Sequence, residues 1–202
     1  MWKESDHIGI KGKPAEVESN ALIKFPMTKD WYTDDIGLIM DEVIRRYGPE
    51  EWRACILTNE MHGHLGIFSI VGVKMGMLAL ELLETDRDSI HVISFTGSHP
   101  PYSCLNDGIQ VSTGATAGHG TIKIINDAKP MVKAVFQLRE NEAILQLKGE
   151  YLKQAEETIR SGKTFYPVSH DMYWKLVRQS GLDYWLEWDR HNIFEYKISN
   201  RP

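Results

Sequence analysis

Cysteine is scarce in this 202-residue chain, which contains only Cys55 and Cys104. Two cysteines are too few for the disulfide framework of a small secreted domain, so we expect two reduced thiols. The first residues, Met-Trp-Lys-Glu-Ser-Asp-His, carry charges where a signal peptide needs an apolar segment. These two absences together predict a cytoplasmic protein.

The chain also lacks any block of charge of one sign. Its net charge is -5, and its 23 Lys and Arg and 28 Asp and Glu residues are spread along the sequence. A nucleic-acid-binding protein normally needs a clustered excess of Lys and Arg, so no nucleic-acid partner is expected. Internal repeats and low-complexity tracts are missing too, which disfavours a solenoid or a disordered chain.

A long uninterrupted apolar run is the third absence. The longest apolar stretch, residues 65–83, contains Lys74, Glu81 and three glycines. Charges and glycines are unfavourable in a hydrocarbon core, so this stretch predicts a buried helix and no membrane partner.

Helical patterns occupy the first half of the chain. An N-cap threonine followed by periodic apolar residues predicts a helix over residues 33–47, and Gly48-Pro49 breaks it before a second helix begins. The apolar helix over residues 67–83 follows. Its Gly72 and Gly76 share one face, so we expect another backbone to pack closely there.

Strand patterns follow in the middle of the chain. Alternation and β-branched residues predict strands at 89–96 and 121–125 and a hairpin from 132–138 and 142–148. A short helix is expected at 104–113. Helices that come before and after a run of strands predict an α+β fold, with helices packed on a largely antiparallel sheet.

Three segments are expected along the chain. Residues 1–30 have little periodicity and are interpreted as an N-terminal arm, and residues 31–162 form the core domain. The core is predicted to close with a helix from Gly149 to about Arg160, ended by Ser161-Gly162. Residues 163–202 form an aromatic-rich C-terminal extension that must pack on an apolar surface of the core.

A His-Gly-His sequence at residues 62–64 and the later Cys104 are candidate metal ligands. Imidazole nitrogen and thiolate sulfur are the ligands that zinc prefers, and three protein ligands leave one coordination position open. The spacing of two residues places His62 and His64 on one edge of an extended turn. Such pairs also arise by chance, and turn histidines that only make hydrogen bonds are the alternative.

Two motifs around these residues resemble the FmdE family, which is named after one of the subunits of formylmethanofuran dehydrogenase. MHGHLG and YSCLNDGIQVSTGATAGHGTI are similar to the family pattern Phe-His-Gly-His-x-Cys-Pro-Gly and, after a long helix, Ser-Cys-x-x-Asp-x-Ile-Gln-x-x-Thr-Gly-Cys-Thr-x-Gly-Lys-Gly. The resemblance covers residues 61–125 in its specific parts and extends loosely to about residue 160. The matching positions are His62, His64, Cys104, Asp107, Gln110, Thr113 and Gly114.

The chain departs from the family pattern at several positions. Gly66 and Ala115 stand where the family has cysteines, Ile67-Phe68 replaces Pro-Gly, and His119 replaces a lysine. The resemblance implies an α+β core that forms an intertwined homodimer. Some members of the family also carry a zinc finger of paired cysteines, which do not occur here. Because two of the family's cysteines are absent, the redox chemistry of a cysteine pair is not expected at this site. The remaining set of two histidines and one cysteine still suits zinc.

Further residues are assigned roles around this site. His119 is a candidate fourth ligand, general base or anion contact, and His99 is expected to line the same pocket or to lie in solvent. Asp107 and Gln110 could orient a metal-bound histidine, or they could cap a helix and form a buried hydrogen bond. Thr113 completes the predicted pocket. Cys55 lies on an apolar helical stretch and is expected to be buried and inert.

Three functions are compatible with these patterns. The first is a zinc-binding homodimeric protein with a small-ligand pocket, which the family resemblance relates to formylmethanofuran dehydrogenase as an accessory protein. The second is a zinc-dependent hydrolase or lyase, with His119 or Asp107 as proton carrier. The third is a non-catalytic interaction protein. No residues in the sequence indicate a site for molybdopterin or tungsten, or a role in formyl transfer.

Overall fold

The computed structural model describes residues 24–127 and 129–200, and most of the expected N-terminal arm lies outside them. In this part of the chain the helices and strands, with two short 3-10 helices, follow one another in this order: η2 (Lys29–Trp31), α1 (Asp34–His62), α2 (Ile67–Leu82), β1 (His91–Ser94), η3 (Tyr102–Cys104), α3 (Leu105–Thr113), β2 (Ile122–Ile124), β3 (Lys133–Leu138), β4 (Asn141–Leu147), α4 (Gly149–Phe165), α5 (Asp171–Glu187), α6 (Arg190–Ile193) and β5 (Phe194–Asn200).

The five strands form one sheet in the order β2-β1-β3-β4-β5. Only β1 and β2 are parallel, and the other neighbours run antiparallel. Arg139, at a φ of 52°, turns the chain between β3 and β4, and β5 adds the far edge by pairing Phe194 with Leu147. The predicted α+β fold with a largely antiparallel sheet is confirmed.

Helices α2 and α3 pack so closely at three glycines that no side chain would fit at these positions. A methyl group on Gly72 would overlap the carbonyl oxygen of Leu105, and one on Gly76 would overlap the hydroxyl of Ser112. Gly108 on α3 has the same relation to α2. The close packing predicted for Gly72 and Gly76 is therefore confirmed, and it fixes α3 against α2.

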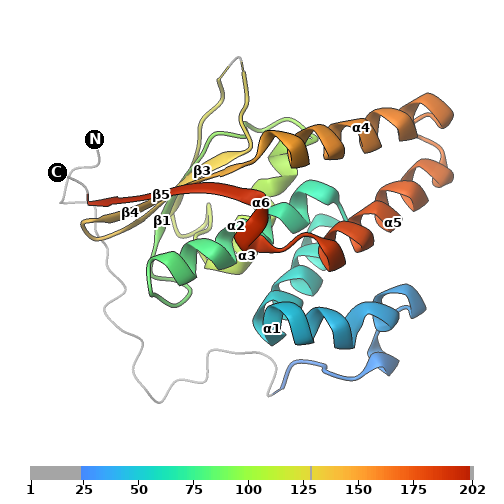
Figure 1. The fold of residues 1–202 in the computed structure, drawn as a ribbon, viewed down its shortest axis with the longest axis horizontal. Helices are drawn as coiled ribbons and strands as arrows, with labels where there is room; N and C mark the ends of the chain where they lie inside the picture. The colour runs from blue at the N-terminus through green and yellow to red at the C-terminus, as the bar shows by residue number, and fades with distance from the viewer. Residues whose placement is uncertain (1–23, 128, 201–202) are drawn as a thin grey trace.

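Two hydrophobic clusters organise the molecule around α2 (Figure 1). One lies between α2, α3 and the sheet and includes Phe68, Ile109 and Phe136. The other lies between α1, α2 and α5, where the rings of Trp52 and Trp185 stack at 5.0 Å. Helix α2 is thus covered on both sides. No helix of the described residues is long and apolar enough to cross a bilayer.

Two predicted helix boundaries have different outcomes. The break at Gly48 is confirmed, because this residue has a φ of 87° and a ψ of 164° inside the segment assigned to α1. The predicted end at Ser161-Gly162 is wrong, since α4 continues to Phe165. A methyl group on Gly162 would lie 3.4 Å from the ring of Tyr173, so this glycine serves the packing of α4 on α5 and does not end the helix.

Candidate functional site

The candidate site lies where α1 ends and α2 and α3 begin. His62 is the last residue of α1, and Gly63 ends the helix in the left-handed conformation at a φ of 80°. His64 follows in the turn before α2. Cys104 ends η3, and Asp107 lies in the first turn of α3. The tight packing of α3 on α2 therefore holds the two sequence motifs side by side.

His62 and Asp107 form the central contact of the site. Nδ1 of His62 lies 2.6 Å from Oδ2 of Asp107, and the His62 side chain is only 11% exposed. The hydrogen bond to Asp107 raises the pKa of His62 to about 9, and the neighbouring Cys104 adds to this increase. Nε2 of His62 is buried and has no hydrogen-bond partner among the described residues. A buried nitrogen without a partner is rare in a folded protein. Because the raised pKa keeps His62 protonated at neutral pH, a metal ion would have to replace the proton on Nε2.

His64 faces the same space as this free nitrogen. The two imidazole rings lie 4.4 Å apart, and burial together with the charge of His62 lowers the pKa of His64. A methyl group on Gly66 would lie 3.4 Å from Nε2 of His64 and 3.5 Å from Nε2 of His62. Both Nε2 atoms therefore border one small space, which the missing side chain of Gly66 leaves open.

Two aromatic residues of α5 border the site. Trp174 packs edge-on against His64 with ring centroids 4.7 Å apart. Burial raises the pKa of Tyr173, and the charge of nearby Cys104 contributes to this rise. The phenol is therefore protonated at neutral pH, and its hydroxyl can donate a hydrogen bond. Apart from the aromatic richness of the segment after residue 162, no sequence pattern indicated these two contacts.

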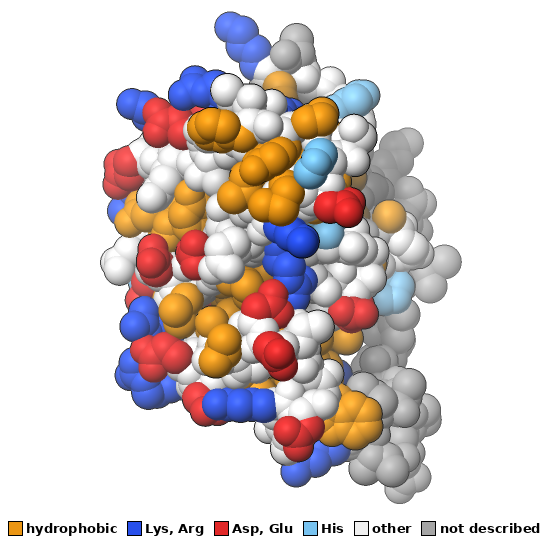
Figure 2. All heavy atoms as spheres, turned by 90° about the vertical axis from the view of Figure 1, so that its right-hand side faces the viewer, with side chains coloured by type: hydrophobic (Ala, Val, Ile, Leu, Met, Phe, Trp, Pro, Cys, Tyr) orange, Lys and Arg blue, Asp and Glu red, His pale blue; other side chains and the backbone are white. Residues whose placement is uncertain are grey.

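Apolar side chains are exposed near the end of α4 and the start of α5. Figure 2 shows this side of the molecule, with hydrophobic side chains and histidines gathered in its upper part. Phe165 is 74% exposed and Trp174 is 41% exposed. Trp174 therefore contacts His64 and is itself partly exposed to solvent.

The side chains do not form a finished coordination sphere. Within residues 24–127 and 129–200, no group of three His, Cys, Asp or Glu side chains is placed to hold a metal ion. His62, His64 and Asp107 are in contact, and Cys104 is close enough to His62 to affect its pKa. The predicted ligands are thus brought together as neighbours, and the zinc site stays a prediction.

Gln110 and Thr113 make local hydrogen bonds farther along α3. The side-chain oxygen of Gln110 accepts a hydrogen bond from the backbone N–H of Ala117 at 3.1 Å. Thr113 is buried; its hydroxyl donates to the carbonyl of Ile109 at 2.6 Å and accepts from the N–H of Ala115 at 3.1 Å. Both side chains stabilise the end of α3 and the turn that follows it.

The remaining predicted residues make no contact with the histidine pair. His119 and His99 are exposed on turns, and neither side chain makes a hydrogen bond, ion pair or ring contact with a described residue. Cys55 is fully buried, and burial raises the pKa of its thiol well above the usual range, which fits the expected inert residue. Two cavities of about 520 and 380 Å³ are lined by other residues.

Two known proteins are similar to this chain over part of its length. A protein of Archaeoglobus fulgidus, named a probable S-adenosyl-L-methionine-binding protein, is 32% identical over 72 residues. The match covers 35% of this chain and only a fifth, 20%, of that protein. The crystal structure of a tungsten formylmethanofuran dehydrogenase FmdE-like protein from Syntrophus aciditrophicus has 20% identity and a TM-score of 0.45, covering 71% of this chain and 68% of that one.

The family comparison covers a larger part of the sequence. Residues 61–195 match the family described as "FmdE, Molybdenum formylmethanofuran dehydrogenase operon". This range contains both motifs and runs from the end of α1 into β5. The chain therefore belongs to the FmdE family and is a protein related to formylmethanofuran dehydrogenase.

Proposed function

We propose that this FmdE-family protein binds one zinc ion through His62, His64 and Cys104 and holds a small ligand beside it. The observation that carries the proposal is the buried, unpartnered Nε2 of His62, which shares a small space with Nε2 of His64. In a metal-free protein, an unpartnered buried nitrogen lowers stability, so its retention needs a functional explanation.

The donor set agrees with zinc chemistry. Two imidazole nitrogens and one thiolate suit this ion, and they leave one position for water or a ligand. Asp107 already binds Nδ1 of His62, which is the arrangement that orients a metal-binding imidazole through its other nitrogen. Because no three-residue group is complete in the described residues, metal binding requires at least one side chain to rotate.

The ligand position is proposed to lie at Gly66, beneath Trp174. Absence of a side chain at Gly66 leaves room beside both Nε2 atoms. The protonated Tyr173 can donate a hydrogen bond to a ligand there, and the ring of Trp174 restricts entry past His64. Family membership supports two further proposals. One is an accessory role next to formylmethanofuran dehydrogenase, which co-purification can test. The other is an intertwined homodimer, which sedimentation can test.

A zinc-dependent hydrolase or lyase is the second candidate function. Zinc would supply Lewis acidity and lower the pKa of bound water. The Asp107–His62 pair is the observation that favours it, because this pair can hold and pass a proton. His119 lies on an exposed turn without contacts to the pair, so it adds no support. A non-catalytic interaction protein is the remaining alternative.

Zinc analysis of the purified full chain tests the proposal. We expect about one zinc per chain in the parent protein. A variant with His62→Ala and Cys104→Ala should lose this zinc. A matched control, with His99→Ala and Cys55→Ala, removes the same residue types elsewhere and should retain the metal.

Two results would contradict the proposal. One is a parent protein that takes up no zinc, with unfolding unchanged by a chelator. The other is equal zinc content in the double variant and its control. Replacement of zinc by cobalt gives an independent measurement, because a thiolate ligand produces a charge-transfer absorption that Cys104→Ala alone should abolish.

A further inference from the structure

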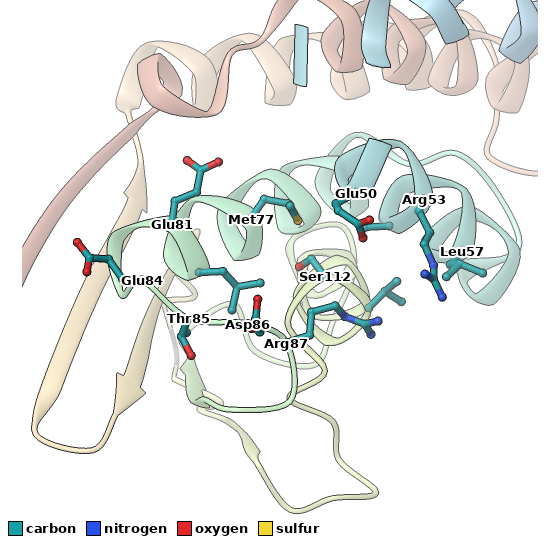
Figure 3. Close-up of a pocket in the computed structure, with 13 residues that line it drawn as sticks. Glu50, Arg53, Leu57, Met77, Glu81, Glu84, Thr85, Asp86, Arg87 and Ser112 are labelled. Atoms are coloured by element: carbon teal, nitrogen blue, oxygen red, sulfur yellow. The ribbon is translucent and has the colours of Figure 1, made fainter. Parts of the chain in front are cut away.

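A cavity of about 520 Å³ lies on a different part of the helical layer from the histidine pair (Figure 3). Its walls come from the second half of α1, the end of α2, the chain after α2, and α3. A volume of this size is typical of sites for small molecules. None of His62, His64 and Cys104 lines it, so the proposed zinc site does not explain it.

The floor of the cavity is apolar. Ala54 comes from α1, Met77 and Leu80 from α2, and Val111 from α3. Ala54 and Leu80 are largely buried, at 5% and 8% exposure. An apolar molecular body of modest size would therefore gain from transfer out of water at this floor.

Two guanidinium groups lack carboxylate partners on one side of this cavity. In Figure 3, the side chains of Arg53 and Arg87 lie toward the Leu57 side. Neither forms an ion pair with a described residue. The guanidinium of Arg53 lies over the ring of Phe25 at 5.7 Å, and its Nε is buried without a hydrogen-bond partner. A planar carboxylate supplies the acceptors that such groups bind best.

Carboxylates line the rest of the rim. Glu81 is already paired with Arg190 and His191. Glu50, Glu84 and Asp86 make no ion pair with any residue that the structure describes. Figure 3 shows Glu81 and Glu84 at the side of the cavity away from Arg53. Glu50 lies on the same side as Arg53, and Asp86 lies between the two ends, so only the end with Glu84 offers an unpaired carboxylate away from both arginines.

The wall after α2 is held in an uncommon backbone conformation. Glu84 has a φ of 49° and Asp88 a φ of 67°, and both are rare for residues other than glycine. The N–H of Asp88 donates to the carbonyl of Thr113 at 2.8 Å, which ties this segment to the end of α3. At Glu84 this conformation ends α2, because the N–H of Thr85 donates to the carbonyl of Leu80 at 3.1 Å. The segment that carries Asp86 and Arg87 is therefore held at both ends.

We infer that this cavity binds a small zwitterion with an apolar body. Its carboxylate would bind at Arg53 and Arg87, and its ammonium group would bind at Glu84, at the other end of the cavity. The apolar body would lie on the floor formed by α1, α2 and α3. This inference is independent of the zinc proposal, because the two sites share no residue.

Titration calorimetry with a dipeptide tests the inference on the full chain. The probe is leucyl-phenylalanine with free termini, which separates its two charges by an apolar body. The same dipeptide as a C-terminal amide lacks the anion, and its N-acetyl form lacks the cation. We expect each capped form to bind about tenfold more weakly than the free dipeptide.

Replacing one charged residue of the cavity at a time shows which charged group of the dipeptide each side binds. In Arg87→Gln the preference for the free dipeptide over its amide should shrink, because only Arg53 remains for the carboxylate. In Glu84→Gln the preference for the free dipeptide over its N-acetyl form should shrink, while its preference over the amide should be kept. Both residues are exposed, so these variants should fold. Arg139→Gln, which changes a charge on the β3–β4 turn, is the control and should behave as the parent protein.

Three results would overturn the inference. The first is no binding of the free dipeptide at millimolar concentration. The second is equal binding of all three forms to the parent protein. The third is a changed sedimentation coefficient in Arg87→Gln, because a second copy of the chain would then occupy the cavity.

Discussion

Two buried polar clusters in the helical layer differ in how completely they are paired. Glu51 accepts hydrogen bonds from Lys74 at 2.7 Å and from Arg190 at 3.0 Å, so both of its oxygens are used. His62 binds Asp107 through Nδ1 but leaves Nε2 without a partner among the described residues. Both clusters include a residue of α1, and both link this helix to a neighbouring one.

The difference separates a structural cluster from a candidate binding site. The Glu51 and Lys74 side chains are 0% exposed and bind each other, which is what charged groups need when they leave water. The His62 cluster keeps Nε2 of His62 unpartnered, next to the small gap beside Gly66. Removal of a partner should therefore damage folding in the first cluster and ligand binding in the second.

The largest expected effect is that of Glu51→Ala. It leaves Lys74 and Arg190 without their buried counter-charge, which should lower the free energy of unfolding by about 3–5 kcal/mol. Urea unfolding of the parent and the variant measures this difference. The double variant Glu51→Leu with Lys74→Met removes both charges and should recover part of the loss. A decrease below about 1 kcal/mol in the single variant would contradict a structural role.

An intermediate effect is expected for Asp107→Asn. The carboxylate that orients His62 is lost, so the affinity for zinc should fall about 10–100-fold. Competition with a chromophoric chelator measures the affinity. The free energy of unfolding of the metal-free protein should change much less than in Glu51→Ala. Asp41→Asn, at an exposed pair with Lys29, is the matched control, and unchanged zinc affinity in Asp107→Asn would count against the proposed site.

The smallest effect concerns a third polar cluster, which is only half-buried. Arg178 of α5 binds Asp35 of α1 with Nε and Oδ2 at 2.6 Å, and this hydrogen bond holds the pKa of Asp35 well below its usual range. A lowered pKa in the folded state stabilises the protein above the unfolded pKa of about 3.9, and this contribution is lost as the pH falls further.

Solvent screening limits this contribution to about 1 kcal/mol or less, because the Asp35 side chain is 37% exposed. Asp35→Asn should therefore lower stability slightly at pH 7 and have a smaller effect near pH 3. Urea midpoints of parent and variant at the two pH values measure it. A difference that grows as the pH falls would contradict the lowered pKa of Asp35.

Local sequence patterns predicted the features that depend on near neighbours. The break at Gly48, the hairpin of β3 and β4, and the close packing at Gly72 and Gly76 follow from a few adjacent residues. The end of α4 was predicted wrongly, because the role of Gly162 depends on Tyr173 in another helix. Strand β5 was not anticipated, since only its pairing with β4 identifies Phe194–Asn200 as part of the sheet.

The candidate site was predictable to a similar degree. The motifs indicated that His62, His64, Cys104 and Asp107 belong together, and the structure places them as neighbours. The contacts of α5 were not predictable, because helical periodicity gives no information about which distant turn a side chain such as Trp174 will cover. Zinc itself and the small ligand remain predictions.

The stacking of Trp52 on Trp185 has a consequence for the order in which the protein can fold. Residues of α1 and α5 share one hydrophobic cluster, although most of the sequence separates them. During synthesis on the ribosome, α1 emerges first, and its apolar face has no partner from α5 until Trp185 has been made. Contacts between residues so distant in sequence slow folding. The surface of α1 that packs on α5 therefore stays exposed to water until α5 has been synthesised.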